Sequence, residues 1–422
     1  MTTETSVTTV PHVGEPFREV MGFAPDAAQH LRVTQEIVWL RLAQLRRLAG
    51  LLRRHEFPHA SGAAALLERL PELPVAARTA VGREPVFHAA FTGLVTALRR
   101  GDRRSAARSL GRLLGTVLLP AAALLEQPVT LDAGPRGTVC FGALDTPLIL
   151  SADLAGTPVE FRHAGDGALD WHASGARGVL WPSTAAREAV VFGGAADLLT
   201  PMLAELEQDP ESFSIEAVRP VAPTAGSRSR FDDAMECLRT SLPRLHEEVV
   251  AAVSLVTPMT SRRTAAFTNT AFQGAVFLRD DLADPLFLLE RLVHEAGHLR
   301  LNAFGTLVPL HEHAWDERVD SPFRTGPRPV TGLLHGAFVF TRAASALVDA
   351  TRETPEATRG AAQARALTDK VSTALATLAA SVRLTPAGRS LVAEIAAERD
   401  RVSGLCGDVA PAAESDYLKG EM

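Results

Sequence analysis

The period of hydrophobic and polar positions changes twice along the chain. From about residue 26 to 125, apolar residues recur at i, i+3 and i+4 with arginines between them, which predicts amphipathic helices. Between 128 and 194, short β-prone runs such as GTVCFGAL and AVVFGG alternate with Gly, Pro and Asp turn signals, which predicts hairpins. From 231 the helical period returns, first over DDAMECLRTSLPRLHEEVVAAVSLV as one expected helix, then at 284–303, at 331–350 and in two or three more helices to about 404. The pattern therefore predicts an α+β fold that is mostly helical, with a β-rich middle segment.

These changes divide the chain into three expected parts. We expect a helical N-terminal region at 1–127, a β-rich segment at 128–220 and a helical domain at 221–422. A chain of 422 residues exceeds the usual size of one hydrophobic core, so several parts are expected. The stretch PVAPTAGSRSR at 220–230 has the composition of a loop or linker, and the polar tail at 405–422 is expected to fray.

Composition and charge exclude several classes of protein. The hydrophobic share of 46% and the net charge of −6 are typical of a soluble globular protein, and no basic block points to nucleic acid or to an anionic membrane. The N-terminal sequence has neither the basic start nor the apolar core of a secretion signal. The uncharged apolar run at 113–125 is shorter than the roughly 20 residues of a membrane span. We expect a cytoplasmic protein.

The cysteines and basic residues add little about function. Cys140, Cys237 and Cys406 are scattered and lack CxxC spacing, so they predict neither a disulfide framework nor a zinc ribbon, and they fit a reducing compartment. Only Lys370 and Lys419 are lysines among 43 basic residues. That preference can arise from genomic base composition, so a single arginine is weak evidence of a binding site.

The H-E-x-x-H metal signature occurs twice, and only one copy can lie on a helix. The pattern needs a continuous helix, because only then do residues i and i+4 lie on the same face and reach one ion. In HEFPH at 55–59, Pro58 breaks the helix inside the motif, so His55 and His59 are not expected to share a metal. In HEAGH at 294–298, the preceding Asp284 and Pro285 are an N-cap and N1 pair that starts a helix.

The second copy therefore predicts His294 and His298 as metal ligands. The helix continues through LFLLERLVHEAGHLRLNAF without another proline, and its apolar stripe can bury it. Gly297 costs about 1 kcal/mol of helix propensity relative to alanine, which a close approach of a neighbouring group would explain. The alternative is that the two histidines are partly buried residues bonded to carbonyl groups.

A third ligand is expected downstream. The segment HEHAWDE at 311–317 contains Glu312, Asp316 and Glu317, but it is typical of a polar connecting loop. His335 is the better candidate, because it lies in the apolar first turns of a helix that is expected to begin near Thr331. Three imidazoles on two helices would leave open positions on a metal.

Arginines near this helix indicate the kind of molecule that the metal could meet. Arg324 and Arg328 lie on the approach to the helix, and Arg342 falls on the face of His335 two turns later. A guanidinium grips a carboxylate through two hydrogen bonds. A metal with arginines around it is therefore suited to a carboxylate-bearing cofactor or substrate.

A resemblance to a known family rests on two segments, LVHEAGHL and SPFRTGPRPVTGLLHGAFVF. Together they resemble the HExxH-motif peptide-modification family, whose members are described as 2-oxoglutarate- and Fe(II)-dependent peptide β-hydroxylases in the biosynthesis of ribosomally made modified peptides. The family pattern is HExxH, then SPWR, then RPL-x-G-x-LHG. Here Phe323 stands where Trp is common and Val330 where Leu is common. The match covers residues 284–343, and the rest of the chain is not diagnostic.

The resemblance implies a site and a reaction. His294, His298 and His335 would bind iron, and Arg328, with Arg324, would hold the distal carboxylate of 2-oxoglutarate. With O2 as co-substrate, a side-chain Cβ of a precursor peptide would be hydroxylated. The β-rich segment could offer an edge strand to that peptide. Glu295 could orient a ligand, place the substrate or bind the metal itself.

Two alternatives remain. A zinc metallopeptidase would use Glu295 as the general base that activates water, although the sequence after His298 lacks the HxxGxxH extension. A closed, structural metal site, or a packed site in a peptide-binding accessory protein, would need no catalysis at all. The sequence alone does not decide between iron and zinc, and it does not determine the oligomeric state.

Overall fold

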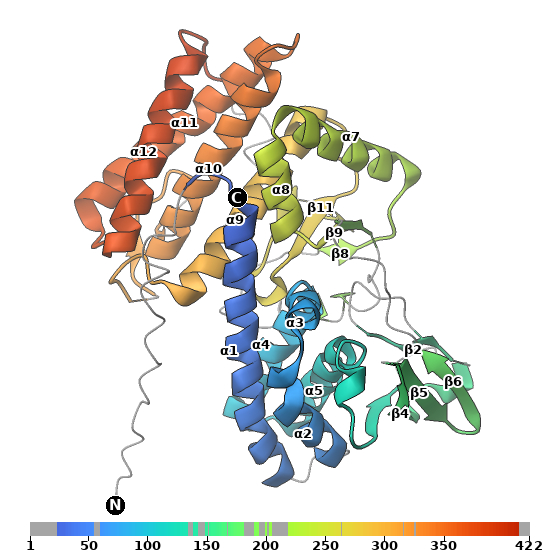
Figure 1. The fold of residues 1–422 in the computed structure, drawn as a ribbon. Helices are drawn as coiled ribbons and strands as arrows, with labels where there is room; N and C mark the ends of the chain where they lie inside the picture. The colour runs from blue at the N-terminus through green and yellow to red at the C-terminus, as the bar shows by residue number, and fades with distance from the viewer. Residues whose placement is uncertain are drawn as a thin grey trace, which may run out of the picture.

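A computed structural model describes residues 23–412, with gaps at 55–59, 134–137, 142–147, 151, 167, 181–189, 194–198, 201, 205–217, 263, 315 and 325. The structure is 62% helix and 14% strand, with helices at both ends of the chain and sheets in the middle. The predicted α+β, mostly helical fold is therefore confirmed. Figure 1 shows the long helix α1 standing beside the smaller N-terminal helices, with the C-terminal helices above them.

The elements follow one another in the order that the labels of Figure 1 give. The α-helices are α1 (Ala27–Arg54), α2 (Ala60–Arg69), α3 (Val75–Gly82), α4 (Pro85–Arg100), α5 (Arg103–Leu118), α7 (Ala225–Ser241), α8 (Pro243–Ala252), α9 (Pro285–Leu307), α10 (Val330–Thr351), α11 (Ala357–Ser381) and α12 (Pro386–Cys406). The strands are β1 (Val129–Asp132), β2 (Thr138–Val139), β3 (Leu148–Ile149), β4 (Pro158–Gly165), β5 (Ala168–Ala173), β6 (Ala176–Leu180), β7 (Val191–Phe192), β8 (Arg219–Pro220), β9 (Leu255–Thr260), β10 (Ala266–Phe267), β11 (Ala275–Arg279), β12 (Arg318–Val319) and β13 (Arg328–Pro329).

The N-terminal helices share a core with an antiparallel sheet. The sheet has the strand order β1-β4-β5-β6, and its inner side chains pack on the apolar faces of α1, α2, α4 and α5. The largest buried side chains of this core include Phe87, Phe141 and Phe161. Strands β1 and β6 lie at the two edges of the sheet, where an extended peptide could pair with them. The pairing of a peptide with this sheet stays a prediction.

A second sheet supports the helix that carries HEAGH. Strand β9 pairs in parallel with β11 and β7, β10 continues the sheet beyond β11, and β8 pairs antiparallel with β9. Residues of β9 and β11 share a core with α7, α8 and the first half of α9. The second half of α9 joins another core, formed with α10, α11 and α12. Helix α9 is therefore buried on nearly all sides.

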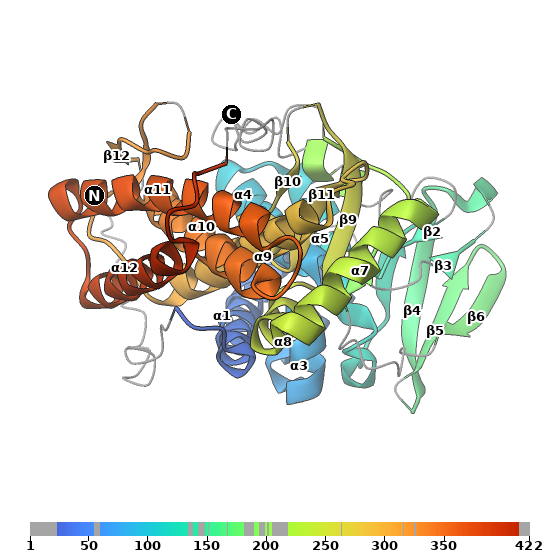
Figure 2. The same cartoon turned by 90° about the horizontal axis from the view of Figure 1, so that it is seen from above.

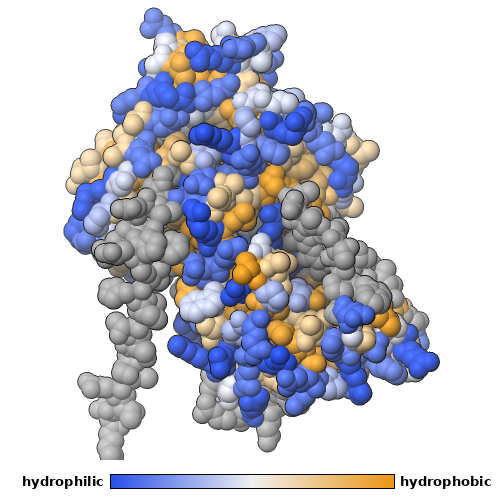
Figure 3. All heavy atoms as spheres, in the orientation of Figure 1, coloured by the Kyte–Doolittle hydropathy of each residue, from blue (hydrophilic) through white to orange (hydrophobic). Residues whose placement is uncertain are grey.

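Helix α10 is the central helix of the C-terminal part. By length and composition alone it could cross a membrane, but 83% of its most apolar window is buried inside the fold, as expected for a core helix. Figure 2 shows α9 and α10 at the centre, with α11 and α12 on one side and β4–β6 at the far end. On the face shown in Figure 3, hydrophilic residues predominate and hydrophobic residues form separate patches.

Two helix boundaries differ from the sequence expectation. Helix α7 begins at Ala225, inside the stretch 220–230 that we expected to be a linker, because Thr224 and Ser227 form a capping box. The single helix expected after 231 is divided into α7 and α8, since Pro243 cannot continue the hydrogen bonding of α7. The expected domain boundaries at 127 and 220 stay a prediction.

Candidate metal centre on helices α9 and α10

Helix α9 begins where the sequence predicted. The side chain of Asp284 accepts a hydrogen bond from the backbone N–H of Leu286, and Pro285 occupies the first turn. This N-cap prediction is confirmed. Gly297 faces α10, where an added Cβ would lie 3.1 Å from Cγ1 of Val339 and 3.7 Å from Cδ of Arg342. The close approach that explains Gly297 is therefore made by side chains of α10.

The structure brings the three predicted histidines into contact. Nε2 of His298 lies 3.2 Å from Nε2 of His294, and Nδ1 of His298 lies 3.0 Å from Nδ1 of His335. The rings of His298 and His335 are stacked, with centroids 5.3 Å apart. Two of the rings come from one turn of α9 and the third from the start of α10. Their contact results from the packing of these two helices.

The chemistry of the cluster fits a divalent metal, but its geometry is that of a chain of rings. Two nitrogens that bind one ion at about 2.1 Å lie roughly 3.0–3.4 Å apart, close to the separations in this cluster. However, His298 turns a different ring nitrogen to each neighbour and can give only one to a shared ion. Within the described part of the chain, no three His, Cys, Asp or Glu side chains are already arranged around one point.

A buried ion pair lies beside the innermost histidine. His294 is only 3% exposed, and its Nδ1 lies 3.8 Å from Oε1 of Glu290, one turn earlier on α9. Glu290 accepts two hydrogen bonds from the guanidinium of Arg291, which lies over the ring of Phe287. A carboxylate near the far nitrogen of a ligating histidine fixes the orientation of the ring and raises its basicity. Glu290 lies on the side of His294 that this role requires, at a distance longer than a hydrogen bond.

Burial keeps His294 and His335 in the neutral form. Burial holds the pKa of His294 well below its ordinary value, and the charges of Arg291 and Arg324 lower it further. Burial also lowers the pKa of His335 from 6.5 to about 4. A histidine binds a metal through an unprotonated nitrogen, so these rings are ready to bind a metal at neutral pH.

The same shifts predict how the stability of the metal-free protein depends on pH. The pKa of His335 is lower in the folded state, so between pH 6.5 and 4 the unfolded chain binds more protons and the folded state is increasingly destabilised. We expect the free energy of unfolding to be lower at pH 5 than at pH 7.5, with His335 contributing on the order of 2 kcal/mol. Urea unfolding at the two pH values measures this loss, and His335→Gln should show a smaller one. An equal loss in that variant would contradict the assignment.

Aromatic residues hold the SPFR loop against α10. The ring of Phe323 stacks on that of Phe340 at 4.7 Å, and Phe340 meets His294 edge to face at 4.9 Å. A Cβ added to Gly336 would lie within 2.2–2.9 Å of the Phe323 ring. The glycine after His335 therefore gives Phe323 the room to lie on α10. Through these contacts the loop is fixed beside the histidines.

Three arginines gather on this loop. Arg324 is exposed, and its charge lowers the pKa of His294, so it lies near the cluster. Arg328 is half-buried on β13, where burial and the charges of Arg324 and Arg318 lower its pKa. The Nε of Arg328 is buried and has no hydrogen-bond partner among the described residues. This concentration of positive charge next to the histidines suits an anionic ligand.

Arg342, which we expected near the cofactor, is engaged elsewhere. Its guanidinium is buried and forms an ion pair with Glu248 of α8, and it also donates to the carbonyl of Phe23 at 2.7 Å. Arg300 of α9 forms a second ion pair with the same Glu248. Glu248 thus links α8 to α9 and α10 through the two arginines, and the structure does not bring the guanidinium of Arg342 to the histidines. A carboxylate-binding role beside Arg324 and Arg328 is not supported for it.

Three other groups of residues were considered as parts of a metal site from the sequence. Glu295 is 3% exposed on α9, next to His294, and its role stays a prediction. In the loop 311–317, His313 pairs with Glu317 at 2.6 Å and accepts from the backbone of Arg383, so this segment is a connection braced against its neighbours. The rejected pair, His55 and His59, lies outside the described residues, between the end of α1 and the start of α2.

Two features of the site were not found from the sequence. Arg318 joins the arginines only because β12 and β13 pair, with Val319 opposite Arg328, and nothing in its local sequence marks it. Glu290 could have been found by its spacing, since it lies four residues before His294 and i, i+4 residues share a helix face.

Comparisons with known proteins add no family to this picture. No protein-family model matches the chain, and no curated protein matches it either. The histidine cluster and its surroundings are therefore the basis for a function.

Proposed function

We propose that the protein is an Fe(II)- and 2-oxoglutarate-dependent oxygenase that hydroxylates a side-chain Cβ of a peptide, in particular a ribosomally synthesised natural-product precursor. The observation that carries the proposal is the contact of His294, His298 and His335 across α9 and α10. The arginines on the adjoining loop supply the second requirement, a place for a dicarboxylate. The resemblance of residues 284–343 to the HExxH peptide-modification family supports iron over zinc.

Each group of residues around the cluster would have its own role in this reaction. His294, His298 and His335 would hold the iron, which with 2-oxoglutarate and O2 supplies the oxidising chemistry. Arg324 and Arg328 would bind the distal carboxylate of 2-oxoglutarate, since a guanidinium and a carboxylate form a charge-assisted, two-point contact. Phe340, packed on His294, excludes water from that side of the ring. Glu290 would keep the His294 ring in its orientation.

An anaerobic absorption experiment tests this function. Addition of Fe(II) and 2-oxoglutarate to the metal-free protein should give a weak visible charge-transfer band, which Fe(II) alone does not give. In Arg328→Ala the band should need at least about tenfold more 2-oxoglutarate, because a charge-assisted hydrogen bond to its carboxylate is lost. Arg383→Ala, a change of an arginine near the 311–317 loop, is the control and should leave the titration unchanged. Absence of the band in the parent protein would refute the proposal.

The buried carboxylate in the motif separates this function from a zinc metallopeptidase. In a peptidase, Glu295 would activate the attacking water, so Glu295→Gln would abolish peptide cleavage. In the proposed oxygenase, Glu295→Gln should retain part of the 2-oxoglutarate-dependent succinate formation. Zn-dependent peptide cleavage that is lost in Glu295→Gln, with no succinate formed from 2-oxoglutarate, would identify the peptidase instead.

A further inference from the structure

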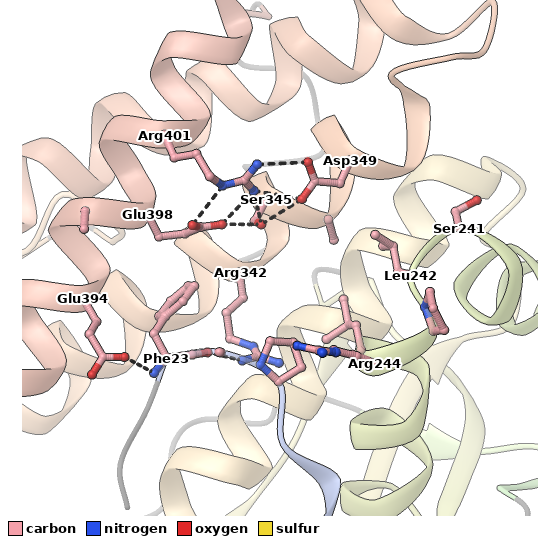
Figure 4. A pocket seen from close by; sticks show the side chains of 16 residues that line it. Phe23, Ser241, Leu242, Arg244, Arg342, Ser345, Asp349, Glu394, Glu398 and Arg401 are labelled. Carbon is pink, nitrogen blue, oxygen red and sulfur yellow. Dashed lines mark hydrogen bonds and ion pairs between the residues drawn. The ribbon is translucent and has the colours of Figure 1, made fainter. Parts of the chain in front are cut away.

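A pocket lies along the second half of α10, whereas His335 lies in the first two turns of that helix. The pocket has a volume of about 780 Å³, within the range of roughly 300–1,000 Å³ that small-molecule sites occupy. Its walls come from the first turn of α8, from α10 and α12, and from the segment before α1. Arg342 enters the pocket from α10 and Arg244 from α8, and Figure 4 shows both below the group of Arg401, Asp349 and Glu398. The apolar part of the lining includes Phe23, Pro25, Leu242 and Leu245.

Charge is unevenly distributed around this pocket. On one side, Arg300 and Arg342 share a single carboxylate, Glu248, so this buried triad carries one net positive charge, and Arg244 adds another. On the other side, Arg401 pairs with both Asp349 and Glu398, which leaves one net negative charge. Figure 4 shows this acidic group, joined by Ser345, above Arg342.

Donors on the positive side have unused capacity. Arg342 is 3% exposed, and its Nε is buried with no hydrogen-bond partner among the described residues. Arg244 is exposed at the pocket and has no ion pair or hydrogen bond with any residue that the structure describes. A buried donor without an acceptor costs about 1–3 kcal/mol, which an anionic ligand would recover.

Acceptors on the negative side have unused capacity too. Glu394 lines this side and, among the residues that the structure describes, accepts one hydrogen bond, from the backbone N–H of Phe23 at 2.5 Å. An ionised carboxylate offers about four acceptor positions, so Glu394 can accept further hydrogen bonds from a cation. The pocket thus presents donors, acceptors and an apolar wall to one bound molecule.

We propose that this pocket binds a small zwitterionic molecule with an apolar body, of the class of free amino acids and dipeptides. Its carboxylate lies between Arg244 and Nε of Arg342, its ammonium group faces Glu394 and the Asp349–Glu398 pair, and its side chains pack on Phe23 and Leu245. The site is separate from the histidine cluster. Binding here does not depend on iron or on 2-oxoglutarate.

Calorimetric titration of the metal-free full-length protein with three probes tests the site. Leucyl-leucine carries both charges, N-acetyl-leucyl-leucine lacks the ammonium group, and leucyl-leucinamide lacks the carboxylate. We expect saturable binding of leucyl-leucine at one site per chain. Each capped probe should bind at least about tenfold more weakly, because one charge-assisted contact is lost.

Variants assign the binding to this pocket. Arg244→Ala should weaken leucyl-leucine at least about tenfold, and it should leave the fold intact because the side chain is exposed. Glu394→Gln keeps an acceptor for Phe23, so it should weaken leucyl-leucine but not N-acetyl-leucyl-leucine. Arg352→Ala, an exposed arginine at the end of α10, is the matched control and should change nothing. No saturable heat with leucyl-leucine, equal binding of all three probes, or full affinity in Arg244→Ala would overturn the proposal.

Discussion

Replacing His335 with alanine is expected to weaken Fe(II) binding by at least about 100-fold. Loss of a residue that only hydrogen-bonds to a metal ligand lowers the metal affinity about 10–100-fold, and loss of a ligand itself should lower it more. The variant removes the ring of α10 that stacks on His298, while His294 and His298 keep their own contact. Anaerobic titration of the metal-free protein with Fe(II) measures the affinity, and the 2-oxoglutarate band should disappear together with it. The effect should be on metal binding rather than on folding.

A neighbouring histidine provides the control for this experiment. Nε2 of His311 forms a hydrogen bond of 2.9 Å with the hydroxyl of Thr331, at the start of the same helix α10. His311 is not one of the three clustered rings. His311→Ala should bind Fe(II) with the affinity of the parent protein. Unchanged affinity in His335→Ala, or an equal loss in both variants, would show that the three rings do not act as one metal site.

The second large effect is expected on stability, at Glu248. This carboxylate is fully buried and pairs with Arg300 of α9 and Arg342 of α10, and it also accepts from the backbone N–H of Asp26 at 2.8 Å. Glu248→Ala leaves two buried guanidinium groups without their carboxylate. Breaking a buried charge pair by removing one partner costs about 3–5 kcal/mol. Urea unfolding should show a fall of this size in the free energy of unfolding.

The adjacent residue is the control for Glu248. Glu247 has the same side chain and lies next to it on α8, but it is exposed. Glu247→Ala should change the free energy of unfolding by no more than about 0.5 kcal/mol. Equal stability of the two variants would contradict the role of the triad. Because the triad joins α8, α9 and α10, Glu248→Ala should also loosen the packing that brings the histidines together.

The candidate ligands were predictable because each lies in a recognisable local pattern. His294 and His298 are one turn apart on a helix whose start is marked by Asp284 and Pro285. The rejection of the competing motif because of Pro58 stays a prediction, since 55–59 lie outside the described residues. His335 was predictable from its place in an apolar helix, although the sequence could not tell which ring nitrogen it would present. The structure turns Nδ1 of His335 toward Nδ1 of His298.

Arg342 marks the limit of this reasoning. Helical spacing places it on the face of His335, which suggested a shared ligand. Its guanidinium instead reaches Glu248, which lies far away in sequence on α8. The direction of a long side chain depends on which charges the other helices bring near it, and a pattern within one helix does not contain that information.

The sequence by itself predicted most of the helices, the hairpins between β1 and β6, the start of α9 and the two helices that carry the histidines, because these depend on residues within a few positions of one another. It did not predict strands β9, β10 and β11, which lie inside the expected helical domain at 221–422. Only the tertiary structure decided which charged groups surround the histidines. The Arg300–Glu248–Arg342 triad and the pocket at Arg244 join distant segments, and Arg318 meets Arg324 and Arg328 only through the pairing of β12 with β13. Burial strengthens the ion pairs of the triad, and burial is a property of the packed chain.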